Sequence, residues 1–142
     1  MENLKSLRER AQFTTEQLAA EVTRLGRPMR ANTITKIEKG QRRVDVDDLM
    51  ALSVALGTSP ARLLMPPTLH GEVELTGSKT VSAFDAWMWA TFRRPLEIPE
   101  GDDGTALVEH QVRSLPVGLR QFGQPGEAGI QGSHGFVPLP GD

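Results

Sequence analysis

The sequence contains no cysteine, which excludes disulfide bonds and thiolate metal sites. Its apolar residues never form a run of about 18, so we expect no transmembrane helix. The first residues, MENLKSLRERAQ, carry charges throughout and lack the apolar stretch of a signal peptide. These absences predict a cytoplasmic protein. The length of 142 residues allows one domain but not two large ones.

Residue patterns that carry catalysis are also missing. His70, His110 and His134 are widely separated and lack acidic partners at ligand spacing, so we expect no metal site. The stretch GQPGEAGIQG has the composition of a phosphate loop, but the sequence predicts no strand before it and no helix after it. Neither a P-loop motif nor a nucleophile elbow occurs. We therefore predict neither an enzyme nor a bound cofactor.

The formal net charge of −2 hides an asymmetry between the two halves of the chain. Residues 1–65 hold eleven Lys and Arg against eight Asp and Glu, whereas residues 66–142 hold five against ten. Within residues 24–43, seven basic side chains face a single acid, Glu38. This pattern is typical of a segment that binds a polyanion, although an ordinary solvated surface explains the charge equally well.

The first 66 residues carry start and stop signals for five short helices joined by tight turns. Thr14 and Gln17 form a capping box for the second helix, and Asp45 and Ser59 have N-cap chemistry for the fourth and fifth. Either Val54 or Ala55 adds to the inner face of the fourth helix. The apolar residues expected to form one small core are Leu4, Leu7, Leu18, Val22, Ile34, Ile37, Leu49, Leu52, Leu56, Leu63 and Leu64.

The stretch ANTITKIEKG, residues 31–40, predicts a short helix that ends at Gly40 and turns Ile34 and Ile37 inward. Two helices joined by a turn form a helix-turn-helix, whose second helix lies in the DNA major groove. A solvated polar face on a structural helix is the competing interpretation. The predicted base-contacting residues are Ala31, Asn32, Thr33, Thr35 and Lys36, and the predicted phosphate-contacting residues are Thr15, Arg30, Lys39, Arg42 and Arg43.

Four motifs in this part of the chain resemble the lambda-repressor-like helix-turn-helix family, also called the XRE family. They are T-x-E-x-L-A at 14–19, T-I-T-x-I-E-x-G at 33–40, L-x-x-L-x-x-A-L-G at 49–57 and S-P-x-x-L-L at 59–64. The resemblance covers residues 3–65. It implies a five-helix DNA-binding domain, usually dimeric, that serves transcriptional regulation. It also implies a structural ion pair between Arg8 and Glu38.

The sequence departs from this family at two places before the third helix. The segment from Ala19 to Ile34 is about five residues longer than usual, and the extra residues fall in TRLGRPMRA. We assign part of the excess to the second helix and the rest to the loop. Arg30 stands where a small N-cap residue is common, so Asn32 or the loop backbone is expected to cap the helix instead.

Beyond Pro67 the sequence becomes less regular. EVELTG, residues 72–77, is a weak candidate for a strand, and residues 82–94 predict an amphipathic helix that Pro95 stops. The stripe on this helix allows three interpretations: packing onto the domain, a dimer contact or an effector pocket. The residues of the stripe are Phe84, Trp87, Met88 and Phe92.

The predicted architecture is therefore all-α, with a DNA-binding domain at 1–66 and an extension at 67–99. Residues 100–142 are rich in Gly and Pro and are predicted to be mostly disordered, with at most a short helix around 106–115. The predicted function is a sequence-specific transcriptional regulator that binds duplex DNA through residues 30–39, as a homodimer. The alternative is a protein-interaction module, antitoxin-like or a partner subunit, whose helix at 82–94 docks another protein.

Overall fold

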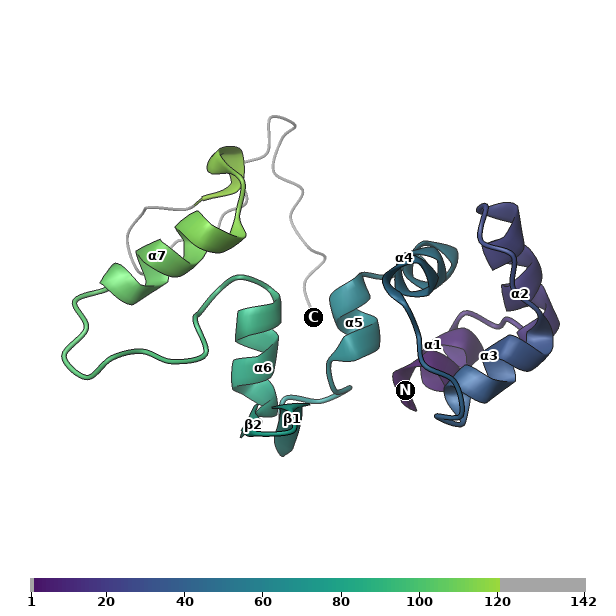
Figure 1. Cartoon of the computed structure of the whole chain (residues 1–142), viewed down its shortest axis with the longest axis horizontal. Coiled ribbons are helices and arrows are strands. Elements are labelled where there is room, and N and C mark those ends of the chain that lie inside the picture. Colours follow the sequence, from purple (N-terminus) through teal and green to yellow (C-terminus); the bar gives the residue numbers. More distant parts are fainter. Residues whose placement is uncertain (1, 121–142) are drawn as a thin grey trace, which may run out of the picture.

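Five short helices form the N-terminal part of the chain in the computed structural model, which describes residues 2–120 (Figure 1). They are α1 (Glu2–Arg10), α2 (Thr15–Arg24), α3 (Ala31–Glu38), α4 (Val46–Ala55) and α5 (Pro60–Leu64). This number and order confirm the prediction for residues 3–64. None of the five exceeds ten residues, so packing of their apolar faces, more than intrinsic helix stability, holds them in place.

The predicted N-caps are confirmed by their hydrogen bonds. Thr14 Oγ1 accepts from the Gln17 N–H at 3.1 Å, and Gln17 Oε1 accepts from the Thr14 N–H at 2.8 Å, which completes the capping box. Asp45 accepts from the Asp48 N–H at 2.7 Å and caps α4. Ser59 caps α5 in the same way, with Pro60 at the first helical position.

One hydrophobic core lies between the five helices. Leu49, Ala55 and Leu56 pack against it partly buried, so Ala55 rather than Val54 is the inward residue of α4. The prediction for Leu64 is wrong, because this side chain is exposed while its neighbour Leu63 is buried; successive residues on a helix point about 100° apart. The buried core residues are Leu4, Leu18, Ala19, Val22, Met29, Ile34, Ile37, Leu52 and Leu63.

Glycines end α2 and α3 in a left-handed conformation that other residues seldom adopt. Gly26 has φ +92° and Gly40 has φ +69°. After each glycine the next N–H bonds back five residues, from Arg27 to the Val22 carbonyl at 3.1 Å and from Gln41 to the Lys36 carbonyl at 2.8 Å. These turns set the direction in which the chain enters and leaves the segment around α3.

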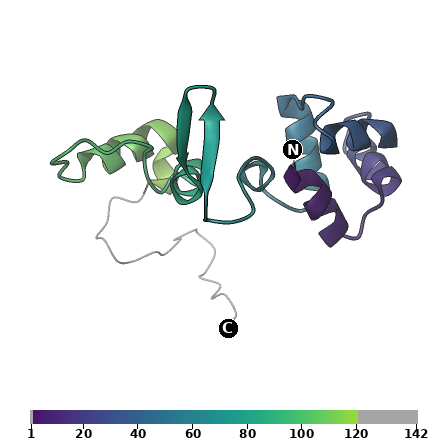
Figure 2. The same cartoon turned by 90° about the horizontal axis from the view of Figure 1, so that it is seen from below.

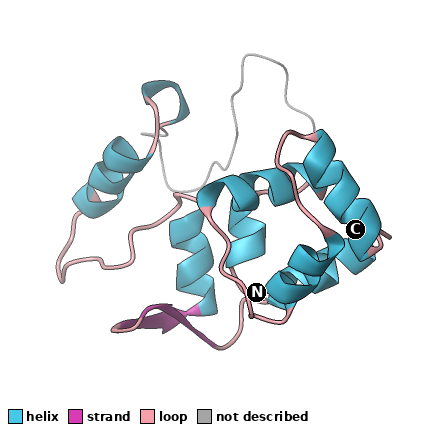
Figure 3. Cartoon of the chain, turned by 45° about the vertical axis from the view of Figure 1, so that its right-hand side comes forward, coloured by secondary structure: helices cyan, strands magenta, loops and turns pink. Residues whose placement is uncertain are grey.

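The second half of the described chain is not all-α as predicted. Strands β1 (Glu72–Thr76) and β2 (Lys79–Ser82) form an antiparallel hairpin in which Val73 lies opposite Val81 (Figure 2). The valines and the alternating exposure of β1 favour a strand, and the tight turn at residues 77–78 lets the chain pair with itself. Figure 3 shows this hairpin leading directly into α6 (Ala83–Ala90).

The helix predicted at 82–94 is shorter than expected, and its buried side differs from the predicted aromatic stripe. Helix α6 ends at Ala90, and Phe92 has φ +63°, which stops the helix before Pro95. Phe84 and Phe92 of the predicted stripe are exposed, whereas Trp87 and Met88 are half-buried. The inward side is instead made of small residues and Trp87, because α6 lies close against both strands. Its members are Ala83, Ala86, Trp87 and Ala90.

Trp87 joins α6 to the end of the five-helix part. Its Nε1 donates to the Pro66 carbonyl at 2.9 Å, and the neighbouring Met65 is buried. Farther along, α7 (Thr105–Ser114) and a short 3-10 helix (Val117–Leu119) lie in the segment predicted to be mostly disordered with at most a short helix. The Gly- and Pro-rich prediction for residues 121–142 falls outside the described residues, as does His134.

Candidate nucleic-acid interface

Helix α3 presents a polar face opposite its buried isoleucines. Ile34 and Ile37 are fully buried, and Asn32, Lys36 and Lys39 are exposed at the i, i+4 and i+7 positions of one surface. This separation fixes α3 to the core through one side and leaves the other side accessible. The accessible side therefore offers an amide and two ammonium groups.

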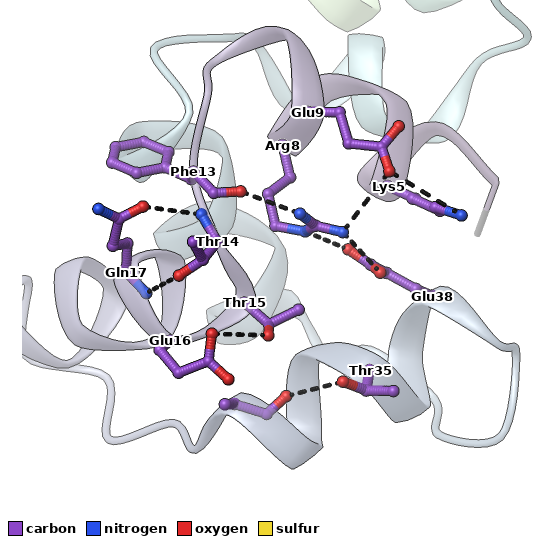
Figure 4. Close-up of polar contacts among 11 residues, drawn as sticks. Lys5, Arg8, Glu9, Phe13, Thr14, Thr15, Glu16, Gln17, Thr35 and Glu38 are labelled. Carbon is purple, nitrogen blue, oxygen red and sulfur yellow. Dashed lines mark hydrogen bonds and ion pairs between the residues drawn. The ribbon is translucent and has the colours of Figure 1, made fainter.

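The other predicted base-contacting residues flank this face. Ala31 packs partly buried against the core, and Thr33 and Thr35 are half-buried. Thr35 Oγ1 donates to the Ala31 carbonyl at 3.2 Å, so its hydroxyl is oriented within the helix while the oxygen keeps acceptor capacity (Figure 4). Asn32 and Lys36 form no hydrogen bond with any other side chain in residues 2–120.

The start of α3 lacks a side-chain cap. Arg30 holds the N-cap position with an extended backbone, and its carbonyl accepts from the Thr33 N–H at 2.8 Å. Asn32 does not cap the helix, because it lies inside the first turn and its side chain is exposed. The prediction that Asn32 caps α3 is therefore wrong, and its amide is not used as a cap.

The predicted phosphate-contacting residues divide into two groups. Arg30, Lys39 and Arg43 are exposed and form no ion pair within the described part of the chain. Arg42 and Thr15 are engaged: Arg42 Nη2 donates to Asp48 at 3.1 Å, and Thr15 Oγ1 donates to the Glu16 carboxylate at 3.1 Å. The first group is the one whose charge is uncompensated beside α3.

Arg8 braces α3 against α1 and the start of α2 (Figure 4). Its Nε donates to Glu38 Oε1 at 2.7 Å and its Nη2 to Glu38 Oε2 at 3.2 Å, while Nη1 donates to the Phe13 carbonyl at 2.9 Å. The two side chains are only 11% and 9% exposed, so this is a desolvated, two-pronged pair. The hydrogen bond to Glu38 raises the pKa of Arg8.

Sequence reasoning missed a second charge cluster at the start of α4. Asp48 is 1% exposed and accepts from Arg27 Nε at 2.7 Å as well as from Arg42. Arg27 Nη2 also donates to Asp45 at 2.5 Å, and the hydrogen bond to Asp48 raises the pKa of Arg27. The arginine of LGRP and the acids of VDVDD could have predicted this cluster. The acids were explained by their position at the start of a helix, which favours negative charge without requiring an arginine partner.

Acidic pH is expected to destabilise the protein partly through Asp45. The N–H of Asp48 donates to the Asp45 carboxylate and lowers the Asp45 pKa, and Arg27 acts in the same direction. A lowered folded pKa means that this stabilisation is complete above the unfolded pKa of about 4 and is lost as the pH falls through the folded value. Thermal melts from about pH 7 to about pH 3 should show a shallower loss for Asp45→Asn, which keeps the cap acceptor. Parallel pH curves for the two proteins would contradict this assignment.

Comparison with known families decides what this arrangement is. Residues 2–64 match a family model described as a helix-turn-helix domain. Residues 2–64 are a helix-turn-helix domain. It is a DNA-binding helix-turn-helix domain of the XRE/Cro-like type. No curated protein and no solved structure matches the chain.

The helix-turn-helix domain contains α1 to α5, and α3 is the helix that follows α2 across residues 25–30. Its matched region ends at Leu64, so the hairpin, α6 and α7 lie outside it. Within residues 2–120, no helix has the length and apolar content to cross a membrane, and no group of His, Cys, Asp or Glu is arranged to hold a metal ion.

Proposed function

We propose that this protein is a transcriptional regulator that binds duplex DNA in a sequence-specific manner through α3. The observation that carries the proposal is the exposed side of α3, where Asn32, Lys36 and Lys39 have no partner among the described residues. The opposite side of α3 is fixed by two buried isoleucines and by the Arg8–Glu38 pair. A rigid helix with an unpaired polar face suits the reading of base edges.

Each side chain on this face has a matching base edge. The Asn32 amide is suited to the N6 and N7 groups of adenine, and Lys36 to the O6 and N7 acceptors of guanine. Thr35 offers its methyl group to thymine, with Ala31 and Thr33 at the margins of the contact. Asn32 and Lys36 are proposed as main readers because they are exposed on this face, and Thr35 because it flanks them on the same helix.

The phosphate contacts are proposed to come mainly from the unpaired cations. Lys39 follows α3 directly, Arg43 lies in the loop between α3 and α4, and Arg30 precedes α3. Thr15 and Arg42 are weaker candidates, since each already has a carboxylate partner. Binding is expected to depend steeply on salt, with log K falling by about 0.9 per unit of log salt for each neutralised phosphate.

A homodimer on paired half-sites is proposed, because one small domain covers few phosphates and few bases. Residues 84–119 carry exposed apolar side chains that could pair with a second copy. They include Phe84, Trp89, Phe92, Ile98, Leu107, Val108 and Val112. Selection of bound duplexes from a random pool tests DNA binding, half-site spacing and dimer symmetry together.

Two substitutions separate base reading from phosphate contact. We expect Thr35→Ala to reduce the preference for the selected duplex roughly five- to tenfold, with little change on a scrambled duplex. Arg43→Ala is expected to weaken binding to both duplexes alike and to lower the salt slope by about 1. Fluorescence anisotropy at two salt concentrations measures both effects.

Lys79→Ala is the control for that pair, because Lys79 lies on β2, outside both the helix-turn-helix domain and the apolar surface of residues 84–119. It should change neither the preference nor the salt slope. Thr35→Ala acting equally on both duplexes would remove Thr35 from the base-reading set.

The second candidate function is a protein-interaction module that uses the same fold. The apolar surface of residues 84–119 favours it, as does the acidic composition beyond residue 65. In that case α6 and α7 would dock another protein. Absence of DNA binding by the unchanged protein even at low salt would favour this function over the regulator.

A further inference from the structure

One buried carboxylate joins the two segments that flank the proposed recognition helix. Asp48 Oδ1 accepts from Arg27 Nε at 2.7 Å, and Asp48 Oδ2 accepts from Arg42 Nη2 at 3.1 Å. Asp48 lies in the first turn of α4 and is 1% exposed. Each oxygen therefore has its own guanidinium partner, and neither is left in apolar surroundings without a donor.

The two arginines occupy equivalent places on either side of α3. Arg27 lies four residues before Ala31, and Arg42 lies four residues after Glu38. Each follows a glycine turn that ends a helix, at Gly26 and at Gly40. Asp48 is thus the point at which the chain entering α3 and the chain leaving it are tied to the same place on α4.

The loop that contains Arg27 is itself held in place. Met29 is buried in the core, its N–H donates to Thr23 Oγ1 at 3.0 Å, and Thr23 Oγ1 donates to the Met29 carbonyl at 3.1 Å. The longer segment before α3 therefore does not loop out but reaches α4 through Arg27. A movement of Arg27 or Arg42 would pass to α3, which has only eight residues and no side-chain cap.

We propose that Asp48 is a positioning residue for DNA recognition, which sets the orientation of α3 by holding Arg27 and Arg42 at its two ends. This inference rests on the proposed DNA-binding function. It assigns specificity to a residue that touches no base. It also makes Arg42 a structural ligand of Asp48 first and a phosphate contact second.

A competing effect is charge, because Arg27 also neutralises acids beside the basic loop. Its Nη1 lies 3.8 Å from Asp47, which is exposed and receives no hydrogen bond from the arginine. Asp47→Asn thus makes the same charge change as Asp48→Asn at the same helix end without breaking the link. Arg24→Gln is the matched control for Arg27→Gln, since within residues 2–120 Arg24 pairs only with Glu21 on its own helix.

The test measures affinities of the full chain for its selected duplex and for a scrambled duplex of equal length. We expect Asp48→Asn and Arg27→Gln each to lower the ratio of the two affinities about tenfold, which is roughly the loss of one base contact. Asp47→Asn and Arg24→Gln should leave the ratio unchanged. The double variant Arg27→Gln/Asp48→Asn should lose no more than Asp48→Asn alone, because both act through one link.

Equal ratios in Asp48→Asn and Asp47→Asn would overturn the proposal, as would additive losses in the double variant. Amide hydrogen exchange of the free protein provides a reading without DNA: α3 should exchange faster in Asp48→Asn than in Asp47→Asn, and equal rates would also overturn it. If Asp48→Asn does not fold, Arg27→Lys provides the test instead. This variant keeps the positive charge but loses the two-pronged geometry of the guanidinium, so its affinity ratio should resemble that of Arg27→Gln. If the protein without substitutions prefers neither duplex, the proposed function is refuted. The hydrogen-exchange comparison still tests whether Asp48 holds α3 in place.

Discussion

Glu38→Ala should destabilise the helix-turn-helix domain by about 3–5 kcal/mol, enough to unfold much of it at room temperature. The substitution removes both oxygens that hold the Arg8 guanidinium, a cation that is 11% exposed in the intact protein. Among the described residues, it leaves only the Phe13 carbonyl and the more distant Glu9 as partners. A domain of this size buries a small core, so it has little stability to lose. Urea denaturation of the full chain, followed by circular dichroism, measures the loss.

Glu9→Ala is the matched control, because Glu9 lies 4.0 Å from Arg8 but is 56% exposed. Its loss should stay below about 1 kcal/mol, the usual value of an exposed pair. If Glu38→Ala does not fold, the double variant Arg8→Met/Glu38→Leu supplies the reading. Replacing both charges with apolar groups should restore most of the stability. Equal losses for Glu38→Ala and Glu9→Ala would show that the pair is not effectively buried.

Leu63→Ala should cost about 2–5 kcal/mol, because it leaves a cavity where α5 meets the core. Leu63 is 1% exposed, and the side chain of Asn3 donates to its carbonyl, so the same residue joins α5 to α1. For a domain of about this size, such a loss lowers the melting temperature by roughly 8–40 °C. Thermal unfolding followed by circular dichroism measures it.

The neighbouring Leu64→Ala makes an identical chemical change on the same helix at a side chain that is 54% exposed. It should change stability by less than about 0.5 kcal/mol. A comparable loss in both variants would mean that the exposed face of α5 is covered in solution, most simply by a second copy of the chain.

Local sequence signals were sufficient for the helices of the N-terminal domain. Caps such as Thr14 and Asp45 and the terminating Gly26 act within a few residues, so their effect is readable without knowing the fold. The same is true of α3, where two isoleucines at helical spacing identify the buried side. The family motifs added the expected Arg8–Glu38 pair, whose members are thirty residues apart and which no local pattern predicts.

The apolar faces were harder to predict wherever two large side chains competed for the inward position. Leu63 and Leu64 are chemically identical, and only the packing of α5 against α1 and α4 decides which is buried. On α6 the aromatic stripe was predicted to be the packing face. The residues buried beside the hairpin are instead Ala83 and Ala86. Hydrophobicity ranks residues for burial, but the space left by the neighbouring element selects among them.

The sequence by itself determined five capped helices and the helix that carries the polar face proposed to read DNA. Only the tertiary structure decided which charges stay available on that face. Arg27 and Arg42 look like any other basic residues in the segment, yet both are bound to Asp48, while Lys39 and Arg43 are unpaired in the described chain. The reason is that an ion pair between distant residues depends on where the backbone brings them, and that position is a property of the packed helices.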